Sequence, residues 1–214
     1  DGYARANGKL GCAVGTSGPG ATNMITGIAG AWFDSTPVLF LTGQVTTFRL
    51  KGDSGVRQFG FQETEIIPMV KPITKYCVQL RDPGRIRYEL EKAIYIAHSG
   101  RPGPVVIDVP VDVSKAETKF AYPEHVHLRS YKPVYKGHPL QISKACKLIE
   151  QARRPVIYSG GGVISSNAST ELREFIRKTG IPVTTTLMGM GAYPETDALS
   201  LKMLGMHGTC YANQ

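Results

Sequence analysis

Short apolar runs alternate along the first half of the chain with longer segments whose apolar residues recur every three or four positions. The short runs have the length and β-branched content of buried strands, and the longer segments have the period of helices. This alternation predicts a parallel sheet covered by helices on both faces, a three-layer αβα arrangement of the α/β class. We expect strands at 9–16, 36–44, 73–80 and 103–110 and helices at 20–35 and 82–100, whereas 62–71 is ambiguous.

The segment 82–100 carries the clearest helix signals. Asp82 is a candidate N-cap, Pro83 stands in the first turn, and Gly100 is expected to end the helix. The apolar residues at helical spacing are Ile86, Leu90, Ala93, Ile94 and Ala97. They predict one face packed against the sheet.

The pattern changes after the first strand–helix series. Residues 116–139 contain three prolines, many polar residues and no periodicity, which is typical of a linker. The α/β alternation then resumes, with helices expected at 140–154 and 169–180 and strands at 155–162 and 181–187. We therefore expect one α/β domain at 1–115, partial at its start, a linker at 116–139, and the first part of a second, Rossmann-like α/β domain at 140–214.

Composition excludes several classes of protein. The formal net charge is +8, but Lys and Arg are dispersed, and no basic run is interleaved with aromatics as in nucleic-acid-binding segments. No apolar run approaches the roughly 18 residues of a membrane helix. The four cysteines form no CxxC pair, which argues against a zinc site and a compact disulfide framework.

The two ends of the sequence resemble the interior of a longer chain. The sequence starts with Asp1, and "DGYARANGKLG" reads as part of a helix already under way. We expect an internal fragment, so the lack of a leader says nothing about location.

A glycine-rich stretch, "GTSGPGATN" at 15–23, joins the first expected strand to the first expected helix. Glycines let a backbone approach a ligand closely, and a helix N-terminus favours negative or accepting groups. The stretch lacks the Gly-Lys-Ser/Thr of a Walker A loop. It is not a nucleophile elbow either, because Gly15 and Pro19 flank Ser17 where that elbow has two glycines. A ligand-binding loop and a tight turn without a ligand both fit it.

A second glycine-rich stretch, "YSGGGVISS" at 158–166, also follows a strand. Gly160 and Gly162 match the first two positions of a dinucleotide fingerprint, but Ser165 stands at the third. The acidic residue expected about twenty positions later is also missing, so the usual mode of NAD binding is not predicted. A different nucleotide remains open.

Several single residues are weaker candidates. Arg101 lies in a rigid Gly/Pro turn and carries a fork suited to phosphate, although a surface arginine fits as well. His125 and His127 have no third ligand near them in sequence, so a metal site is not predicted. His207 has glycines on both sides, as a loop residue that faces a ligand can. Gln62 and Lys75 are polar positions beside apolar runs.

Taken together, the motifs resemble the large catalytic subunit of acetohydroxyacid synthase (acetolactate synthase), a thiamine diphosphate-dependent family. The similarity covers nearly the whole chain, in order and in rough spacing. The motifs are "DGYARANGKLG", "TSGPGATN", "TGQV", "FQET", "ITKY", "SGRPGPVVIDVP", "YSGGGV", "TTTLMGMGAYP" and "LGMHGTCYAN".

The resemblance implies a pyrimidine-binding domain followed by a central domain that carries FAD. It places Gly18, Pro19, Asn23 and Gln62 at the thiamine diphosphate, and Phe61 and Lys75 at the substrate. The residues that it places at FAD are Ser35, Arg101, Gly160, Gly161, Gly162, Thr186, Leu187, Leu204, Gly205, Met206 and His207.

The resemblance also implies a reaction: decarboxylation of pyruvate and transfer of the two-carbon unit to pyruvate or 2-oxobutyrate, in the biosynthesis of valine and isoleucine. No catalytic residue is expected in this chain, because the glutamate that activates the cofactor is expected upstream of Asp1. The Mg²⁺ ligands are likewise expected outside the chain, and FAD is expected to be structural. The implied assembly is a homodimer or homotetramer, compatible with a regulatory small subunit, in the cytoplasm or in an organelle of a plant or fungus.

One departure from the family leaves the reaction open. Thr46 replaces a proline after "TGQV", and the route to "FQET" is about six residues longer than usual in the family. A sister thiamine diphosphate enzyme, such as a glyoxylate carboligase, pyruvate oxidase or 2-oxo acid decarboxylase, is one alternative. A catalytically silent fragment that serves as an interaction module is another.

Overall fold

A computed structural model describes residues 1–118 and 128–214. The chain forms two compact units, Asp1–Pro133 (unit 1) and Val134–Gln214 (unit 2). The boundary between them lies inside the segment 116–139. The part of that segment before Val134 belongs to unit 1, because Leu128 and Tyr131 pack against the core of that unit.

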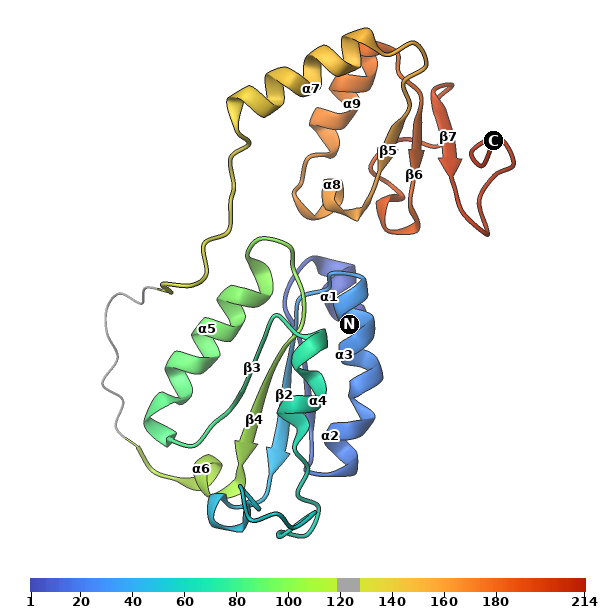
Figure 1. Ribbon diagram of the computed structural model, residues 1–214. Helices are drawn as coiled ribbons and strands as arrows, with labels where there is room; N and C mark the ends of the chain where they lie inside the picture. The colour runs from blue at the N-terminus through green and yellow to red at the C-terminus, as the bar shows by residue number, and fades with distance from the viewer. Residues whose placement is uncertain (119–127) are drawn as a thin grey trace. The chain divides into compact units, whose positions relative to one another are not determined.

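Unit 1 is built around a four-stranded parallel sheet with the strand order β1-β2-β4-β3 (Figure 1). All four predicted strands are present, each somewhat shorter than its apolar run. The strands are β1 (Gly11–Gly15), β2 (Val38–Gln44), β3 (Tyr76–Gln79) and β4 (Val105–Pro110). The helices are α1 (Gly2–Asn7), α2 (Pro19–Asn23), α3 (Ile25–Phe33), α4 (Ile66–Val70), α5 (Ile86–His98) and α6 (Val111–Lys115).

Each face of this sheet has its own core. On one face, Phe40 and Val106 pack with Ile28 of α3 and Ile66 of α4. On the other face, residues of β2 and β4 pack with Ala93, Ile96 and Ala97 of α5. Figure 1 shows α5 on one side of the sheet and α1 to α4 on the other. The predicted α/β fold with three layers is confirmed.

Two predicted helices differ from the structure in detail. The helix expected at 20–35 is two helices, separated at Met24, whose N–H bonds back to the carbonyls of Ala21 and Thr22. In the second helix, a short 3₁₀ turn (Pro83–Arg85) precedes α5, and the Asp82 side chain accepts from the Gly84 N–H as an N-cap does. Ile94 was wrongly placed on the buried face: it is 38% exposed, whereas Ile96 is 5% exposed.

Unit 2 contains a three-stranded parallel sheet with the order β5-β6-β7. Its core joins Ile176, in the helix Ser169–Thr179, to Val183 of the central strand and to Tyr193. The sequence predicted α7 (Pro139–Gln151), β5 (Ile157–Ser159), α9 (Ser169–Thr179) and β6 (Val183–Thr185). It did not predict α8 (Gly161–Ser165), the 3₁₀ helix η4 (Leu187–Gly189) or β7 (Ser200–Met203), which are too short to show a period.

The longest helices that the structure describes have 13 residues, and none combines the length and apolar character that crossing a bilayer requires.

Candidate functional site

The carboxyl edge of the unit 1 sheet is hollowed into an open cavity of about 530 Å³. Its walls come from the ends of β1, β2 and β4 and from the start of α6. In open parallel sheets, ligands bind at this edge, where the loops that follow the strands meet. The loop that follows β1 is the glycine-rich stretch singled out from the sequence.

The structure brings the two motifs predicted for thiamine diphosphate into contact. Gly18 precedes α2 with a φ of +62°, and a Cβ added to it would lie 2.9 Å from Cβ of Gln62 and 3.0 Å from its carbonyl oxygen. Pro19 opens α2 and Asn23 closes it. No side chain fits at Gly18, so a glycine there serves close approach as well as the turn.

Gln62 is itself in an unusual conformation, with a φ of +62°. A left-handed glutamine is strained and persists only where its surroundings hold it. Phe61, the neighbouring residue predicted to contact substrate, is 83% exposed.

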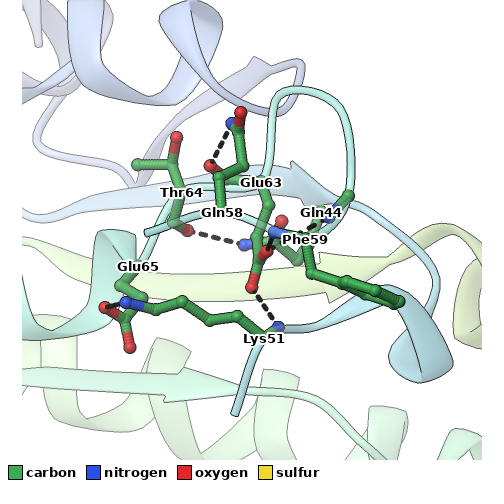
Figure 2. A network of polar contacts seen from close by, with 8 residues as sticks. Gln44, Lys51, Gln58, Phe59, Glu63, Thr64 and Glu65 are labelled. Atoms are coloured by element: carbon green, nitrogen blue, oxygen red, sulfur yellow. Dashed lines mark hydrogen bonds and ion pairs between the residues drawn. The ribbon is translucent and has the colours of Figure 1, made fainter. Parts of the chain in front are cut away.

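The side chain of Glu63 closes the loop formed by residues 46–60 (Figure 2). Its carboxylate accepts from the backbone N–H groups of Lys51 at 2.6 Å and Phe59 at 2.8 Å, and more weakly from Gly60 at 3.3 Å. The Gln58 amide donates to the Glu63 carbonyl at 3.0 Å, and Lys51 also pairs with Glu65 at 2.7 Å. Residues 46–60, where the sequence analysis expects a departure from the family, therefore form a loop closed by one carboxylate.

The chemistry of Glu63 follows from these contacts. Burial alone raises the pKa of its carboxyl, but the N–H groups of Lys51, Phe59 and Gly60 and the Lys51 ammonium outweigh burial and hold the pKa below its usual value. The loop is tied at its other end by Thr47, whose N–H and hydroxyl both donate to Asp112 of α6.

This arrangement predicts a pH-dependent loop. Because the pKa of Glu63 is lower in the folded state, its stabilising effect is present above the unfolded pKa, near 4.5, and is lost as the pH falls through the folded value. We expect Glu63→Gln to speed amide hydrogen exchange of residues 51–60 about tenfold or more at neutral pH. The difference from the wild type should disappear in acid, and equal exchange at neutral pH would contradict the role of Glu63.

Asp108, in the middle of β4, is a buried carboxylate that the sequence analysis missed because it read the run as an apolar strand. It is 0% exposed. Thr42 donates to its Oδ1 at 2.6 Å, and Gln79 and Gln44 donate to its Oδ2 at 2.9 and 3.2 Å. Burial raises the pKa of Asp108, and these donors counteract the rise only in part. The signal in the sequence was a single acid inside an otherwise apolar strand.

The amino edge of the same sheet carries a second group of predicted residues. Arg101, just before β4, donates to the hydroxyl of Ser35 at 2.7 Å, and Ser35 has a φ of +59°. Arg101 and Lys75 line a cavity of about 280 Å³ with Trp32 and Phe33 at the end of α3. Two residues predicted for FAD and one predicted for substrate thus lie together.

The ammonium of Lys75 is occupied within unit 1. It donates to the carbonyl of Ile96, to that of Ser99 at 2.6 Å and to the hydroxyl of Tyr131 at 3.0 Å, so it satisfies the carboxyl end of α5. Phe61 belongs to the carboxyl edge of the sheet and Lys75 to the amino edge. The structure therefore does not bring the two predicted substrate residues together within one unit.

In unit 2, all three segments predicted for FAD follow strands of one sheet and meet at its carboxyl edge. The Gly160–Gly162 segment follows β5, Thr186 and Leu187 follow β6, and 204–207 follow β7. Backbone hydrogen bonds join neighbouring segments, from the Thr186 N–H to the Ser159 carbonyl at 2.9 Å and from the Leu204 N–H to the Thr185 carbonyl at 3.3 Å.

The glycine loop of unit 2 packs closely against the turn after β6. A Cβ added to Gly161 would lie 2.9 Å from Cβ of Met188, and one added to Gly189 would lie 2.5 Å from the Ser159 carbonyl oxygen. The hydroxyls of Ser159 and Thr185, register neighbours at the ends of β5 and β6, are buried and have no hydrogen-bond partner among residues 1–118 and 128–214. A glycine cradle above unpaired hydroxyls fits a polar ligand at this edge.

The last predicted segment is held by a side chain further along the chain. The Asn213 amide bonds to both the N–H of Gly205, at 2.8 Å, and its carbonyl, at 3.0 Å. Met206 is 94% exposed, and His207 is exposed beside it. Both side chains are accessible to a ligand.

No group of three or more His, Cys, Asp or Glu side chains suited to a metal ion occurs in residues 1–118 and 128–214. His125 and His127 lie outside the described residues.

Comparison with known proteins places both units in one family. Residues 1–69 match the "Thiamine pyrophosphate enzyme, N-terminal TPP binding domain", and residues 142–214 match the "Thiamine pyrophosphate enzyme, central domain". The matches cover the glycine-rich loop and Gln62 in unit 1 and all the unit 2 segments described above.

Curated relatives align with the entire chain. It is 48% identical over 215 residues to the acetolactate synthase large subunit of Buchnera aphidicola subsp. Schizaphis graminum, with 100% of the chain and 37% of the relative covered. It is 51% identical to the probable acetolactate synthase large subunit of Methanocaldococcus jannaschii and 44% identical to the acetolactate synthase isozyme 3 large subunit of Escherichia coli, again over the whole chain and 36% of each relative. The chain thus spans just over a third of the length of these relatives.

These alignments confirm the resemblance that the motifs indicated. The two family models match the two units, and the alignments with the relatives extend over both units. The chain therefore belongs to the thiamine pyrophosphate enzymes, with matches to their N-terminal TPP binding domain and to their central domain.

Proposed function

We propose that the protein containing these two units is an acetolactate synthase, a transferase that decarboxylates pyruvate and passes the two-carbon unit to pyruvate or 2-oxobutyrate. The reaction serves the synthesis of branched-chain amino acids. The observation that carries the proposal is the contact of Gly18 with Gln62 at the carboxyl edge of a sheet in the TPP-binding domain. The identity of 44–51% to acetolactate synthase large subunits supports this reaction over others of the family.

In this proposal, unit 1 holds the aminopyrimidine end of thiamine diphosphate. Pro19, Asn23 and Gln62 form its wall, and Gly18 allows the two segments to approach. The bound cofactor supplies the nucleophilic carbon that attacks the substrate carbonyl. The chain's own residues orient the cofactor and exclude water from the site. Phe61, whose side chain is exposed, is proposed to contact the acceptor substrate.

Unit 2 is proposed to bind FAD at its carboxyl edge. The glycine loop and Thr186 and Leu187 provide the cradle, and Leu204, Gly205, Met206 and His207 provide a third wall. The unpaired hydroxyls of Ser159 and Thr185 support a polar ligand there. Ser35 and Arg101, which are joined by a hydrogen bond within unit 1, are also proposed as FAD-binding residues.

The remaining parts of the proposal concern the longer protein. We place the activating glutamate and the ligands of Mg²⁺ outside this chain. We propose a homodimer or homotetramer in the cytoplasm or an organelle, and a regulatory small subunit, because the relatives are named large subunits.

The test of the proposed function is product analysis with the longer protein. Thiamine diphosphate, Mg²⁺ and FAD are supplied with pyruvate alone and then with pyruvate and 2-oxobutyrate. We expect acetolactate in the first case and acetohydroxybutyrate in addition in the second, both identified by mass and both absent without thiamine diphosphate. Acetaldehyde or acetate would instead identify a sister enzyme, and no turnover would contradict the proposal.

A further inference from the structure

Asp108 lies at the centre of a polar row that crosses the unit 1 sheet. Thr42 of β2 and Gln79 of β3 are its register neighbours on either side, and both donate to its carboxylate. Gln44, two residues beyond Thr42 and on the same face, donates to the same carboxylate. Phe40 and Val106 lie further back on that face, in the core under α3 and α4.

Gln44 connects this row to the turn that carries Gln62. Its Nε2 donates to the Thr64 carbonyl at 2.7 Å (Figure 2). The same Nε2 donates to Asp108 Oδ2 at 3.2 Å, while its Oε1 accepts from the Val45 N–H at 2.9 Å. A flipped amide would point its oxygen at two acceptors. The carboxylate of Asp108 therefore fixes which way the Gln44 amide faces.

Two contacts hold the residues that directly follow Gln62. Glu63 is held by the N–H groups of the 46–60 loop, and the Thr64 carbonyl is held by Gln44. Gln62, whose backbone is left-handed and strained, lies between Gly18 and these anchors. Because strained backbone persists only where its surroundings hold it, the loss of either anchor is expected to let Gln62 relax and to disturb its contact with Gly18.

The polar row is costly for a sheet interior. No lysine or arginine within residues 1–118 and 128–214 pairs with Asp108, and an apolar side chain in β4 would avoid burying the charge. Asp108 therefore lowers stability, yet it orients the Gln44 amide that holds the turn at Gln62. A residue that combines these two properties is expected to serve the binding site.

We propose that Asp108, acting through Gln44, is a positioning residue that holds the Gln62–Thr64 turn against Gly18 and so preorganises the thiamine diphosphate site. This inference rests on the proposed function of unit 1. It assigns a role to two residues that touch neither cofactor nor substrate in that proposal.

The test compares two amides that donate to the same oxygen of Asp108. Gln44→Met removes the link to Thr64, whereas Gln79→Met removes an equivalent donor that has no contact with the turn. Thiamine diphosphate is titrated with Mg²⁺ into the longer protein, and half-saturation and kcat are measured. We expect half-saturation to rise about tenfold in Gln44→Met and less than about twofold in Gln79→Met, with kcat at saturating cofactor nearly unchanged in both.

A rescue variant and a second readout separate positioning from general stability. Asp108→Asn keeps an acceptor for Gln44, since the Thr42 hydroxyl can turn to accept from the new amide, and its half-saturation should stay within about threefold of the wild type. Amide hydrogen exchange at Gln62, Glu63 and Thr64 in the protein without cofactor should be faster in Gln44→Met only.

Two results would overturn the inference. One is wild-type cofactor affinity in Gln44→Met, and the other is equal weakening in Gln44→Met and Gln79→Met, which would mean a structural role alone. If the wild type itself bound no thiamine diphosphate, the proposed function would fail, and that result is distinguishable because it appears before any variant is made.

Discussion

Replacing Gly18 by alanine is expected to weaken thiamine diphosphate binding about a hundredfold, roughly 2.7 kcal/mol. The added Cβ would lie 2.9 Å from Cβ of Gln62 and 3.0 Å from its carbonyl oxygen, closer than van der Waals contact allows. Part of this collision is with backbone, so a side-chain rotation does not relieve it. The Gln62 turn or the start of α2 must move, and both belong to the proposed cofactor wall. The measurement is a cofactor titration of the longer protein in the presence of Mg²⁺.

Gly52 provides the matched control for this substitution. Its φ is +50°, so alanine there meets the same unfavourable backbone region, but no atom lies within 4 Å of an added Cβ. Gly52→Ala should therefore cost about 1 kcal/mol of stability and leave cofactor affinity within about twofold. Equal affinities in Gly18→Ala and the wild type would show that the cofactor does not depend on the contact of Gly18 with Gln62.

Replacing Gly189 by alanine is expected to abolish flavin retention and to lower the free energy of unfolding of unit 2 by about 2–3 kcal/mol. A Cβ at this position would lie 2.5 Å from the Ser159 carbonyl oxygen and 3.1 Å from Cα of Gly160. The η4 turn would be driven away from the glycine loop, and the cradle proposed for FAD would open. Flavin absorbance of the purified longer protein, together with denaturant unfolding, measures both effects.

Gly191 separates this packing effect from backbone strain. It has a φ of +90° and nothing within 4 Å of an added Cβ, so Gly191→Ala strains the chain without displacing the glycine loop. We expect it to keep flavin despite a stability loss of about 1–2 kcal/mol. Flavin retained in Gly189→Ala at the wild-type level would mean that the ligand is bound elsewhere.

The larger elements of the fold could be predicted from sequence because their patterns are long enough to show a period. The strands that end at Gly15, Gln44 and Pro110 lie where the apolar runs predicted them, and so does the helix Ile86–His98. Short elements such as α8 and η4 could not be predicted, since five or three residues contain no period and their glycines signal only a turn. Ile94 was misplaced because it lies about 100° around the helix from Ala93. That position is at the edge of the face on which Ala93, Ile96 and Ala97 are buried, so Ile94 stays 38% exposed.

The candidate site was only partly predictable. Motif similarity pointed to Gly18 and Gln62 separately, and their contact emerged from the tertiary structure. The closing of the 46–60 loop on Glu63, and the buried Asp108 row, depend on side chains from several strands and loops that meet only when the sheet forms. The separation of Phe61 from Lys75 likewise follows from strand direction, which places residues before and after strands at opposite edges. The cofactor roles of these residues stay predictions.

An experimental structure of the longer protein with thiamine diphosphate, Mg²⁺ and FAD bound tests the central claim most directly. The account predicts the aminopyrimidine ring against Pro19, Asn23 and Gln62, with the Gln62–Thr64 turn still held by Gln44. It also predicts FAD along the loops that follow β5, β6 and β7. Thiamine diphosphate bound away from the Gly18–Gln62 contact, with this turn free of any ligand, would contradict the account.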